Sequence, residues 1–343
     1  MRFIEEQNLQ SSSDGLSGDE ALSISVFKDN SPATIRLYRY KPCVIVGRYQ
    51  NLTDAINLDA CKEYGFEWNR RHSGGGTVMM GPDQVAVALV IPDKKGKFIG
   101  SIREYFHFFA GIFSNALHKF GIKSEFMGKN DLCVDGKKIA GLAISQDVDG
   151  VIFFHASLLM DFDINLMVKI LNLPTDFLND RGQSCFSERM TSIYQYNQSV
   201  TYDEIKNAII KSLEEKMKVN SEKASWSEFE INTINKLKME KYENDEWIYS
   251  TRVMRRWKGS AEKKTPGGTI RVYIDGNGSV LDAVLVTGDY FCRNVDLAML
   301  ESSLKGTPAR YEDIMKVLKN QKCEKIYQLN NETLTEIILE AKK

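Results

Sequence analysis

The sequence predicts an α/β (α+β) fold in two parts, a mixed-sheet domain over residues 1–245 and a small α+β domain over residues 246–343. In the first part, short runs rich in β-branched and aromatic residues alternate with stretches of helical periodicity, which is the pattern of a sheet covered by helices. Beyond about residue 200 the chain becomes more charged, and a new series of strands and helices follows Trp247. The 343 residues suffice for two domains, each with its own hydrophobic core.

Periodicity and turn residues predict the elements of the first part in order. A short helix over 19–27 follows a segment rich in Ser, Gly and Asp, and a helix that starts at Leu58 ends at Gly65, the residue type that commonly follows a helix. A longer apolar pattern at helical spacing covers 102–120 and also ends at a glycine. Strands are predicted at 33–40, 43–49, 84–92 (apolar throughout and buried on both faces), 131–145 (a hairpin that turns at Asp135–Gly136) and 151–162.

The same signals predict the elements of the second part. Thr201 and Glu204 have the spacing of a capping box, so a helix begins there. A second charged helical stretch over 230–247 is a candidate for the connection to the C-terminal domain. After it, two strands surround a Gly-Asn-Gly turn, and two helices follow at 295–306 and 309–320.

The composition argues against several classes of protein. Hydrophobic residues make up 43% and charged residues 27%, and the formal net charge of -1 provides no global field that would attract nucleic acid or an anionic membrane surface. No window approaches the ~20 continuous apolar residues of a membrane span, and a signal peptide is not expected. The cysteines show no CxxC pair and no close Cys/His spacing, against a zinc site or a disulfide framework: Cys43, Cys61, Cys133, Cys185, Cys292 and Cys323. We therefore expect a cytoplasmic protein.

The most unusual segment is RRHSGGG at residues 70–76. Three consecutive glycines weaken a strand, so something must approach this backbone closely, and the arginines suggest an anion. Neither a P-loop nor a GxGxxG pattern is present. The bare N–H groups of Gly74, Gly75 and Gly76, which we predict to lie on a hairpin-like strand, can bind phosphate oxygens, and Arg71 can add a bidentate contact. The alternative is a glycine-rich turn flanked by solvated arginines.

A second candidate segment is GKNDLCVDGKKIAG at residues 128–141. Lys137 and Lys138 are adjacent on a predicted strand, so one of them faces the interior if the other faces solvent. Inward lysines are uncommon and usually have an anionic partner. The alternative is a hairpin tip on which both ammonium groups are solvated.

The third candidate segment is FFHASLLMDFD at residues 153–163. A lone histidine in an apolar run, here His155, is more often a packed and hydrogen-bonded residue than a catalyst. The small side chains of Ala156 and Ser157 would allow a ligand to approach closely.

In this order and with these intervals, the segments resemble those of the lipoate–protein ligase family. PCVIVGRYQN (42–51) is similar to the family's segment ending in G-R-x-Q-N, RRHSGGG to R-R-x-S-G-G-G, GKNDLCVDGKKIAG to G-x-N-D-L…G-x-K-I-x-G, and FHASLLMDFD to H-G-T-L-L. The stretch GGTIRVYIDGNGSVLDAVLVTGDYF…LESSLKG is similar to the accessory domain of two-domain members. The resemblance covers nearly the whole chain. It implies a catalytic domain of the biotin/lipoate ligase type, and an accessory domain that could cover the site and protect a reactive intermediate from water.

The resemblance also implies an activity. ATP and lipoate form lipoyl-adenylate and pyrophosphate, and the lipoyl group passes to a lysine of an apo lipoyl carrier domain, either a glycine-cleavage carrier or a dehydrogenase E2 domain. ATP and Mg²⁺ are the implied cofactors, lipoate is the substrate, and neither nucleic acid nor a membrane is an expected partner. Preorganised cations and N–H donors would offset the repulsion between carboxylate and phosphate.

Residue roles follow from the matched motifs. Lys138 is the implied catalytic residue, in contact with the lipoate carbonyl and the α-phosphate, and Asp131 is implied to lie near Mg²⁺. The implied ATP- and adenylate-binding residues are Arg71, Gly74, Gly75, Gly76, Thr77, Val78, Met79, Asn130, Asp131 and Lys138. The implied lipoate-binding residues are Arg71, Lys138, Gly141, His155 and Ser157, with Met79, Met80 and the strand after Gln84 as candidates for an apolar tunnel wall.

The sequence departs from the family pattern at several positions. After the triple glycine the family reads A-V-F-H-D-x-G-N, whereas this chain reads TVMMGPDQ, and Ala55 and Ala156 replace a glutamate and a glycine. MGPDQ is similar to H-G-P-G-Q of the octanoyltransferases, a sister family that transfers an acyl chain from a carrier through a cysteine without ATP. Cys185 is in about the right region for that cysteine, although Arg189 and Thr191 nearby match the ligases. An octanoyl or lipoyl transferase or amidotransferase, and a non-catalytic lipoate-binding paralogue, are therefore alternatives.

Overall fold

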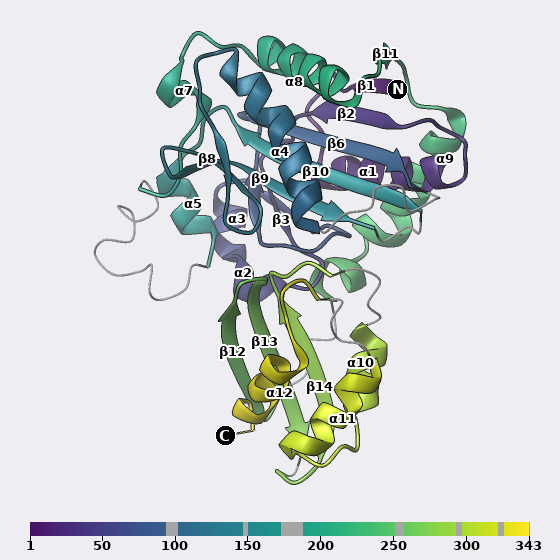
Figure 1. Ribbon diagram of the computed structural model, residues 1–343, viewed down its shortest axis with the longest axis vertical. Coiled ribbons are helices and arrows are strands. Elements are labelled where there is room, and N and C mark those ends of the chain that lie inside the picture. Colours follow the sequence, from purple (N-terminus) through teal and green to yellow (C-terminus); the bar gives the residue numbers. More distant parts are fainter. Residues whose placement is uncertain are drawn as a thin grey trace.

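A mixed eight-stranded sheet forms the centre of the N-terminal part (Figure 1). The computed structural model describes residues 1–93, 102–146, 150–172, 188–250, 257–276, 278–292, 297–321 and 326–342. The strand order is β11-β1-β2-β6-β10-β9-β8-β7; β11, β1 and β2 run parallel, and the remaining neighbours pair antiparallel. The strands are β1 (Arg2–Glu5), β2 (Thr34–Tyr38), β6 (Gln84–Pro92), β7 (Glu125–Met127), β8 (Asp131–Val134), β9 (Lys137–Ser145), β10 (Val151–Leu159) and β11 (Glu222–Lys223).

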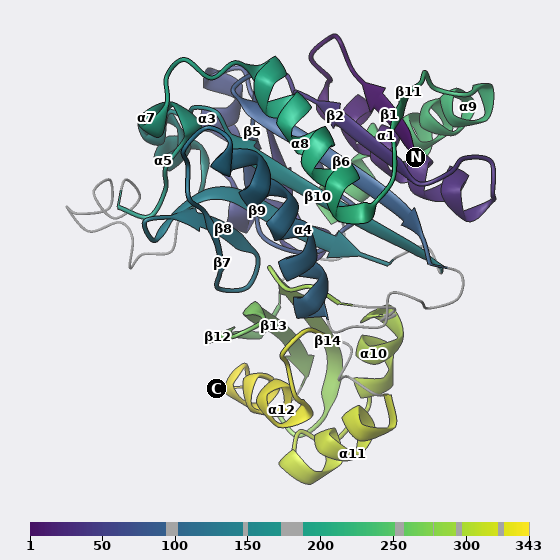
Figure 2. The ribbon, with the colours of Figure 1, turned by 45° about the horizontal axis from the view of Figure 1, so that its top comes forward.

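Helices cover both faces of this sheet, which is why β6 is buried as predicted from Gln84 to Ile91, with Pro92 exposed at its end. One face of β6, with Val85 and Val87, packs with α4 (Ile102–His118) and α8 (Tyr202–Met217), which cross the sheet side by side (Figure 2). The other face, with Ala86 and Ala88, packs against α1 (Ser12–Phe27). The further helices of this part are α2 (Leu52–Ala55), α3 (Leu58–Glu63), α5 (Ile164–Ile170), α7 (Ile193–Tyr196), α9 (Glu228–Leu237) and the π-helices η2 (Lys238–Tyr242) and η3 (Glu246–Ser250).

The first helix is longer than the sequence predicts. The expected start near residue 19 is wrong, because Ser11 caps the helix by accepting a hydrogen bond from the N–H of Asp14, and α1 already begins at Ser12. The segment rich in Ser and Gly is therefore helical, and Gly15 and Gly18 lie against Tyr40 and Arg36. By contrast, the capping box of Thr201 and Glu204 is confirmed at the start of α8.

A second, three-stranded sheet carries the glycine segment. It has the order β4-β3-β5, with β3 (Cys43–Val46) parallel to β4 (Glu67–Arg70) and antiparallel to β5 (Val78–Met80). Residues 71–77 form an irregular loop from β4 to β5. The prediction of a hairpin-like strand for Gly74–Gly76 is therefore wrong; because β4 and β5 flank β3, their connection has to cross the end of β3 rather than turn as a hairpin.

The C-terminal part has its own hydrophobic cluster between a sheet and helices. The sheet is antiparallel in the order β12 (Gly259–Thr265), β13 (Gly268–Gly276) and β14 (Leu281–Gly288), and the helices are α10 (Leu297–Leu304), α11 (Tyr311–Gln321) and α12 (Asn331–Glu340). The sequence predicted β13, β14, α10 and α11 but neither β12 nor α12. The boundary between residues 245 and 246 stays a prediction. Within the described ranges, the chain has no helix that is long and apolar enough to cross a membrane.

Candidate active site

A bulge in β9 directs Lys138 toward the face of the sheet that carries α1. Asp131 on β8 pairs with Gly141, whereas Cys133 pairs with Lys138, so Ile139 is an extra residue in β9. The ladder to β8 is interrupted there, and the main chain of Lys138 bonds instead to the segment 189–191: its N–H donates to the carbonyl of Arg189 and its carbonyl accepts from Thr191. A bulge re-aims a side chain in this way without ending the strand.

The Lys138 side chain lies across Gly141 and beside Asp131. A Cβ atom at Gly141 would be 3.4 Å from both Cε and Nζ of Lys138 and 3.6 Å from Oγ of Ser157. The ammonium nitrogen is 2.7 Å from Oδ1 of Asp131, and about a third of each side chain is exposed. The predicted anionic partner of an inward lysine is therefore Asp131.

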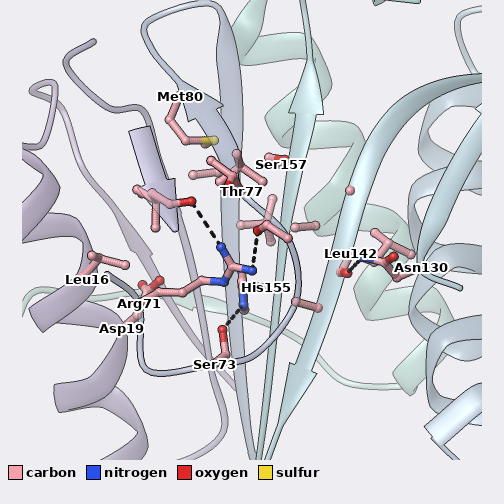
Figure 3. A pocket seen from close by; sticks show the side chains of 18 of the residues that line it. Leu16, Asp19, Arg71, Ser73, Thr77, Met80, Asn130, Leu142, His155 and Ser157 are labelled. Carbon is pink, nitrogen blue, oxygen red and sulfur yellow. Dashed lines mark hydrogen bonds between the residues drawn. The ribbon is translucent and has the colours of Figure 1, made fainter. Parts of the chain in front are cut away.

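Small residues make the sheet hollow beside Lys138. Across strands β9, β10 and β6, Gly141 pairs with Ser157, and Ser157 with Ala86. The next row is Ala143, His155 and Ala88. These residues leave room for a cavity of about 320 Å³ between the sheet, the loop 71–77 and α1, and Figure 3 shows it with Leu16 and Asp19 at one side and Asn130 and Leu142 at the other.

The side of the cavity next to α1 is polar and fully paired. Asp19 accepts hydrogen bonds from Tyr38 Oη at 2.7 Å and from Arg36 at 2.9 Å, and the Tyr40 hydroxyl is 3.1 Å from that of Tyr38. Burial raises the pKa of the Asp19 carboxyl. Sequence reasoning missed this cluster, because its members are far apart in the chain and belong to no motif. Of the predicted apolar wall residues, Met80 lines this cavity and Met79 lines a neighbouring cavity.

Arg71 supports the loop of residues 71–77, which we call the glycine loop, rather than pointing a free guanidinium into the cavity. Its N–H groups donate to the carbonyls of Gly74 (2.8 Å), Gly76 (2.7 Å) and Ile45 (3.3 Å). Burial lowers the pKa of Arg71 to about 10. The expected bidentate phosphate contact is therefore not preformed, because the donors it requires are bonded to main-chain oxygens.

Because the glycines have no side chains, a segment of the C-terminal part can lie directly against their backbone. We call residues 288–292, which follow β14 and lie against the glycine loop, the roof segment. The N–H of Gly75 donates to the carbonyl of Tyr290 at 3.0 Å. A Cβ at Gly74 would overlap that carbonyl, and one at Gly75 would be 2.8 Å from the ring of Phe291. The close approach inferred from the sequence is thus made by protein backbone in this arrangement, and of the three glycines only Gly76 lines the cavities.

Lys129 and Asp289 join the site although sequence reasoning named neither. Lys129 Nζ donates to the main-chain carbonyl of Asp289 at 2.7 Å, and both residues line the cavity. Burial lowers the pKa of Lys129, partly offset by Asp289 and Asp131. The available signal was the basic side chain one position before Asn130 in GKNDL. Asn130 itself donates to the carbonyl of Leu142 at 2.7 Å, which fixes the segment before β8 against β9.

His155 is a packed residue that bonds Ser73. Its Nε2 atom is 2.7 Å from the Ser73 hydroxyl. Burial, followed by the charges of Arg71 and His72, holds the pKa of His155 well below its usual value, so the ring is neutral at physiological pH. This geometry favours His155 as a packed, hydrogen-bonded residue rather than a catalyst, and its bond fixes Ser73 next to the glycines.

A second cavity, of about 880 Å³, adjoins the first. The residues common to both linings are Gly76, Thr77, Val78, Asp131, Lys138, Gly141, Ser157 and Asp289. Its remaining lining comes from both parts of the chain and includes Met79, Ala55, Arg189 and Arg271. All predicted site residues except Gly74 and Gly75 therefore line at least one of the two cavities, and Lys138 lies where they meet.

The described cysteines and acidic residues do not indicate a cysteine-based or a metal-based active site. Cys43, Cys61, Cys133 and Cys292 line neither cavity. Burial raises the pKa of the first three, which disfavours a reactive thiolate. Cys185 lies outside the described residues. In the part of the chain that the structure describes, no three His, Cys, Asp or Glu side chains gather closely enough to hold a metal ion by themselves.

The comparison with protein families is decisive. A sequence model of the lipoyl protein ligase A/B catalytic domain matches residues 13–214, which is more than half of the chain. The chain belongs to this family. A model of the bacterial lipoate protein ligase C-terminus matches residues 257–338, so this lipoyl ligase family member also carries the accessory region that the sequence predicted.

Individual relatives include both ligases and transferases. The chain is 26% identical over 321 residues to the lipoate-protein ligase LplJ of Bacillus subtilis, covering 93% of this chain and 94% of the relative. It is 24% identical over 250 residues to the octanoyltransferase LipM of Clostridioides difficile, covering 67% of this chain and 91% of the relative. The solved structure of Plasmodium falciparum LipL1 in complex with lipoate superposes with a TM-score of 0.74 over 99% of both chains at 18% identity. This likeness confirms the predicted fold.

Proposed function

We propose that the protein is an ATP-dependent lipoate–protein ligase. It activates lipoate as lipoyl-adenylate with release of pyrophosphate, and then transfers the lipoyl group to a lysine of an apo lipoyl carrier domain. The observation that carries this proposal is that two cavities meet at Lys138 and Asp131. A ligase of this kind must hold an acyl chain and a nucleotide separately and bring only their reacting ends together.

The first cavity suits the acyl chain. From Gly141 to Tyr38 the lining crosses β9, β10, β6 and β2. Three strand spacings of ~4.8 Å give a length of ~14 Å, comparable with an extended medium-chain acyl group. The carboxylate would lie at the Lys138 end, where the cavity joins its neighbour, and the apolar chain would lie over Ala86 and Val78.

The second cavity suits the nucleotide, with its α-phosphate beside Lys138. In the first step a carboxylate oxygen of lipoate bonds to the α-phosphorus, the bond from that phosphorus to the bridging oxygen breaks, and pyrophosphate leaves. Both reactants are anions, so the Lys138 ammonium lowers the barrier by offsetting their repulsion. In the second step the amine of the carrier lysine attacks the acyl carbonyl, AMP leaves and an amide forms. Neither step needs an enzyme nucleophile.

Asp131 and Asp289 are suited to Mg²⁺ that is bound with the nucleotide. Both line the two cavities, and Mg²⁺ is usually held by one or two carboxylates together with substrate phosphates. When bound, the ion would neutralise charge on the phosphates. The roof segment closes the other side of the site and so limits the access of water to an adenylate.

The runner-up is an octanoyl or lipoyl transferase that works without ATP. It is favoured by the LipM relatives and by the sequence MGPDQ, and its cysteine would be Cys185. The ligase is supported by LplJ, whose match extends over 93% of the chain, and by the C-terminal family match.

The test is pyrophosphate release from ATP in the presence of lipoate, octanoate or biotin. The ligase predicts release with lipoate, none with biotin, and lipoylation of an apo carrier domain, either a glycine-cleavage carrier or an E2 domain. Consumption of octanoyl-carrier with no pyrophosphate release would identify the transferase instead. Cys185→Ala separates the two further, since it abolishes the transferase and leaves the ligase active.

A further inference from the structure

Three described lysine and arginine side chains line the first cavity, and they differ in their partners. Arg71 is committed to main-chain carbonyls of its own loop and of β3. Lys138 is paired with the Asp131 carboxylate at 2.7 Å. Lys129 bonds a neutral acceptor, the main-chain carbonyl of Asp289 at 2.7 Å, while the nearest carboxylate oxygen of Asp289 is 3.9 Å away.

The surroundings of Lys129 hold its ammonium in the lining of the first cavity, beside Asp289, which lines both cavities. Its side chain is only 17% exposed, and Nζ lies 5.3 Å from the ring centre of Phe291. Gly268 provides the space on the other side, since a Cβ there would be 2.8 Å from Nζ of Lys129. A buried ammonium gains more from an anion than from a carbonyl, because hydrogen bonds between two charged groups are the stronger ones.

The carboxylate of Asp289 is held away from Lys129. Its Oδ1 atom accepts from the N–H of Thr269 on β13. The contact that fixes Lys129 is therefore made by the main chain of the roof segment. In the same segment, the carbonyl of Tyr290 accepts a hydrogen bond from the N–H of Gly75. Lys129 in the cavity lining and the N–H of Gly75 in the glycine loop thus each bond a main-chain carbonyl of the roof segment, and a phosphate could replace the carbonyl at Lys129.

We infer that Lys129 is a further substrate-binding residue, whose ammonium binds the departing pyrophosphate of ATP once the main chain of Asp289 has released it. This inference rests on the proposed function. Lys138 serves the α-phosphate, and a single ammonium cannot balance the charge of a triphosphate. The main-chain carbonyl of Asp289 and the triphosphate therefore compete for the Lys129 ammonium.

The experiment compares wild type, Lys129→Gln, Lys129→Arg and Lys123→Gln, the last of which alters an exposed lysine away from the cavities. Binding of Mg-ATP and of inorganic pyrophosphate is measured by calorimetry. The two half-reactions are measured as lipoate-dependent pyrophosphate release and as transfer from supplied lipoyl-adenylate to an apo carrier domain.

We expect Lys129→Gln to weaken binding of both phosphate probes by about tenfold or more, the size expected for loss of a hydrogen bond between charged groups. Pyrophosphate release should fall with it, whereas transfer from lipoyl-adenylate should stay within about twofold, because the adenylate has no pyrophosphate. Lys129→Arg should recover most of the loss, and Lys123→Gln should match wild type.

Two outcomes would overturn the inference while leaving the ligase intact. One is unchanged phosphate binding in Lys129→Gln; the other is an equal loss in both half-reactions together with a lower melting temperature, which is what a purely structural lysine gives. A wild-type protein that neither binds Mg-ATP nor releases pyrophosphate would instead reject the proposed function, and the role of Lys129 with it.

Discussion

At the scale of single residues, one inserted amino acid decides whether Lys138 can act. Without Ile139 as the extra residue in β9, strand alternation would put Lys138 and Gly141 on opposite faces, because they are three positions apart. The bulge puts the ammonium over Gly141, where the two cavities meet. The sequence motif thus specifies a backbone irregularity as well as a lysine.

Replacement of Lys138 by alanine should lower lipoate-dependent pyrophosphate release by about 10²–10³, the usual loss for one preorganised electrostatic contact. Lys137→Ala is the matched control, since Lys137 lines neither cavity. Initial rates with both variants at saturating ATP are the measurement. Comparable rates for Lys138→Ala and Lys137→Ala would remove Lys138 from the chemistry.

His155 should make the protein less stable below its ordinary pKa. Burial holds the pKa of His155 in the folded protein well below the ordinary histidine value of 6.5, so on acidification the unfolded chain takes up a proton that the folded chain does not bind. The contribution of His155 to stability is therefore complete above about pH 6.5 and decreases as the pH falls below it. His155→Gln should flatten the dependence of the unfolding free energy on pH between 6.5 and 5. A slope for His155→Gln equal to that of the wild type would contradict the burial argument.

The sequence predicted which residues gather at the site better than it predicted what they bond. Lys138, Asp131, Ser157 and Gly141 all line the cavities, because motif residues on adjacent strands share a face. The donors of Arg71 are satisfied within the protein, which depends on the path of an irregular loop and is not encoded in strand periodicity.

At the scale of elements, α1 shows that glycines in a sequence do not reliably mark where a helix begins. A Cβ at Gly15 would overlap the ring of the buried Tyr40, and one at Gly18 would be 2.6 Å from Nη1 of Arg36. These glycines are required by residues of β2 and the chain after it, and the same close approach lets Arg36 reach Asp19. Such contacts are long-range, so local propensity placed the helix start seven residues too late: at 19 instead of 12.

Two glycine-to-alanine changes in helices should therefore have opposite effects on stability. Gly15→Ala should destabilise the protein by ~1–3 kcal/mol through overpacking against Tyr40. Gly111→Ala in α4 meets only the end of the flexible Lys216 side chain, so helix propensity should dominate and stabilise by up to ~1 kcal/mol. Thermal and denaturant unfolding give both values. Destabilisation by both changes alike would mean that α1 is not held as tightly as described.

Elements with strong local signals were predicted well, and those that depend on partners were not. The capping box of α8 and the Asp135–Gly136 turn, where both residues have positive φ, are confirmed. The strands β1, β11 and β12 are short or mostly polar, and their pairing rather than their composition makes them strands.

At the scale of the whole molecule, the glycine loop is also the surface on which the two parts of the chain meet. Besides the Gly75–Tyr290 bond, the rings of Tyr49 and Tyr290 stack at 4.9 Å, and the N–H of Gly288 donates to the carbonyl of Tyr49. Movement of the accessory part therefore changes the environment of the glycines directly.

Gly74→Ala should loosen this contact, whereas Gly76→Ala should not. A Cβ at Gly74 would overlap the Tyr290 carbonyl, and backbone on both sides leaves no easy relief. A Cβ at Gly76 would be 3.8 Å from Asp289, an ordinary contact. Small-angle scattering should report a more open protein for Gly74→Ala alone. The same profile for both variants would show that the glycines do not control closure.

The ring of Phe291 has a consequence for any attempt to split the protein. Although it belongs to the roof segment, it is 2% exposed and packs in the principal core of the N-terminal part, with its ring centre 5.8 Å from that of Phe106. Two separately expressed polypeptides would thus have to share this aromatic anchor, and we expect their affinity for each other to depend on it more than on the surrounding polar pairs.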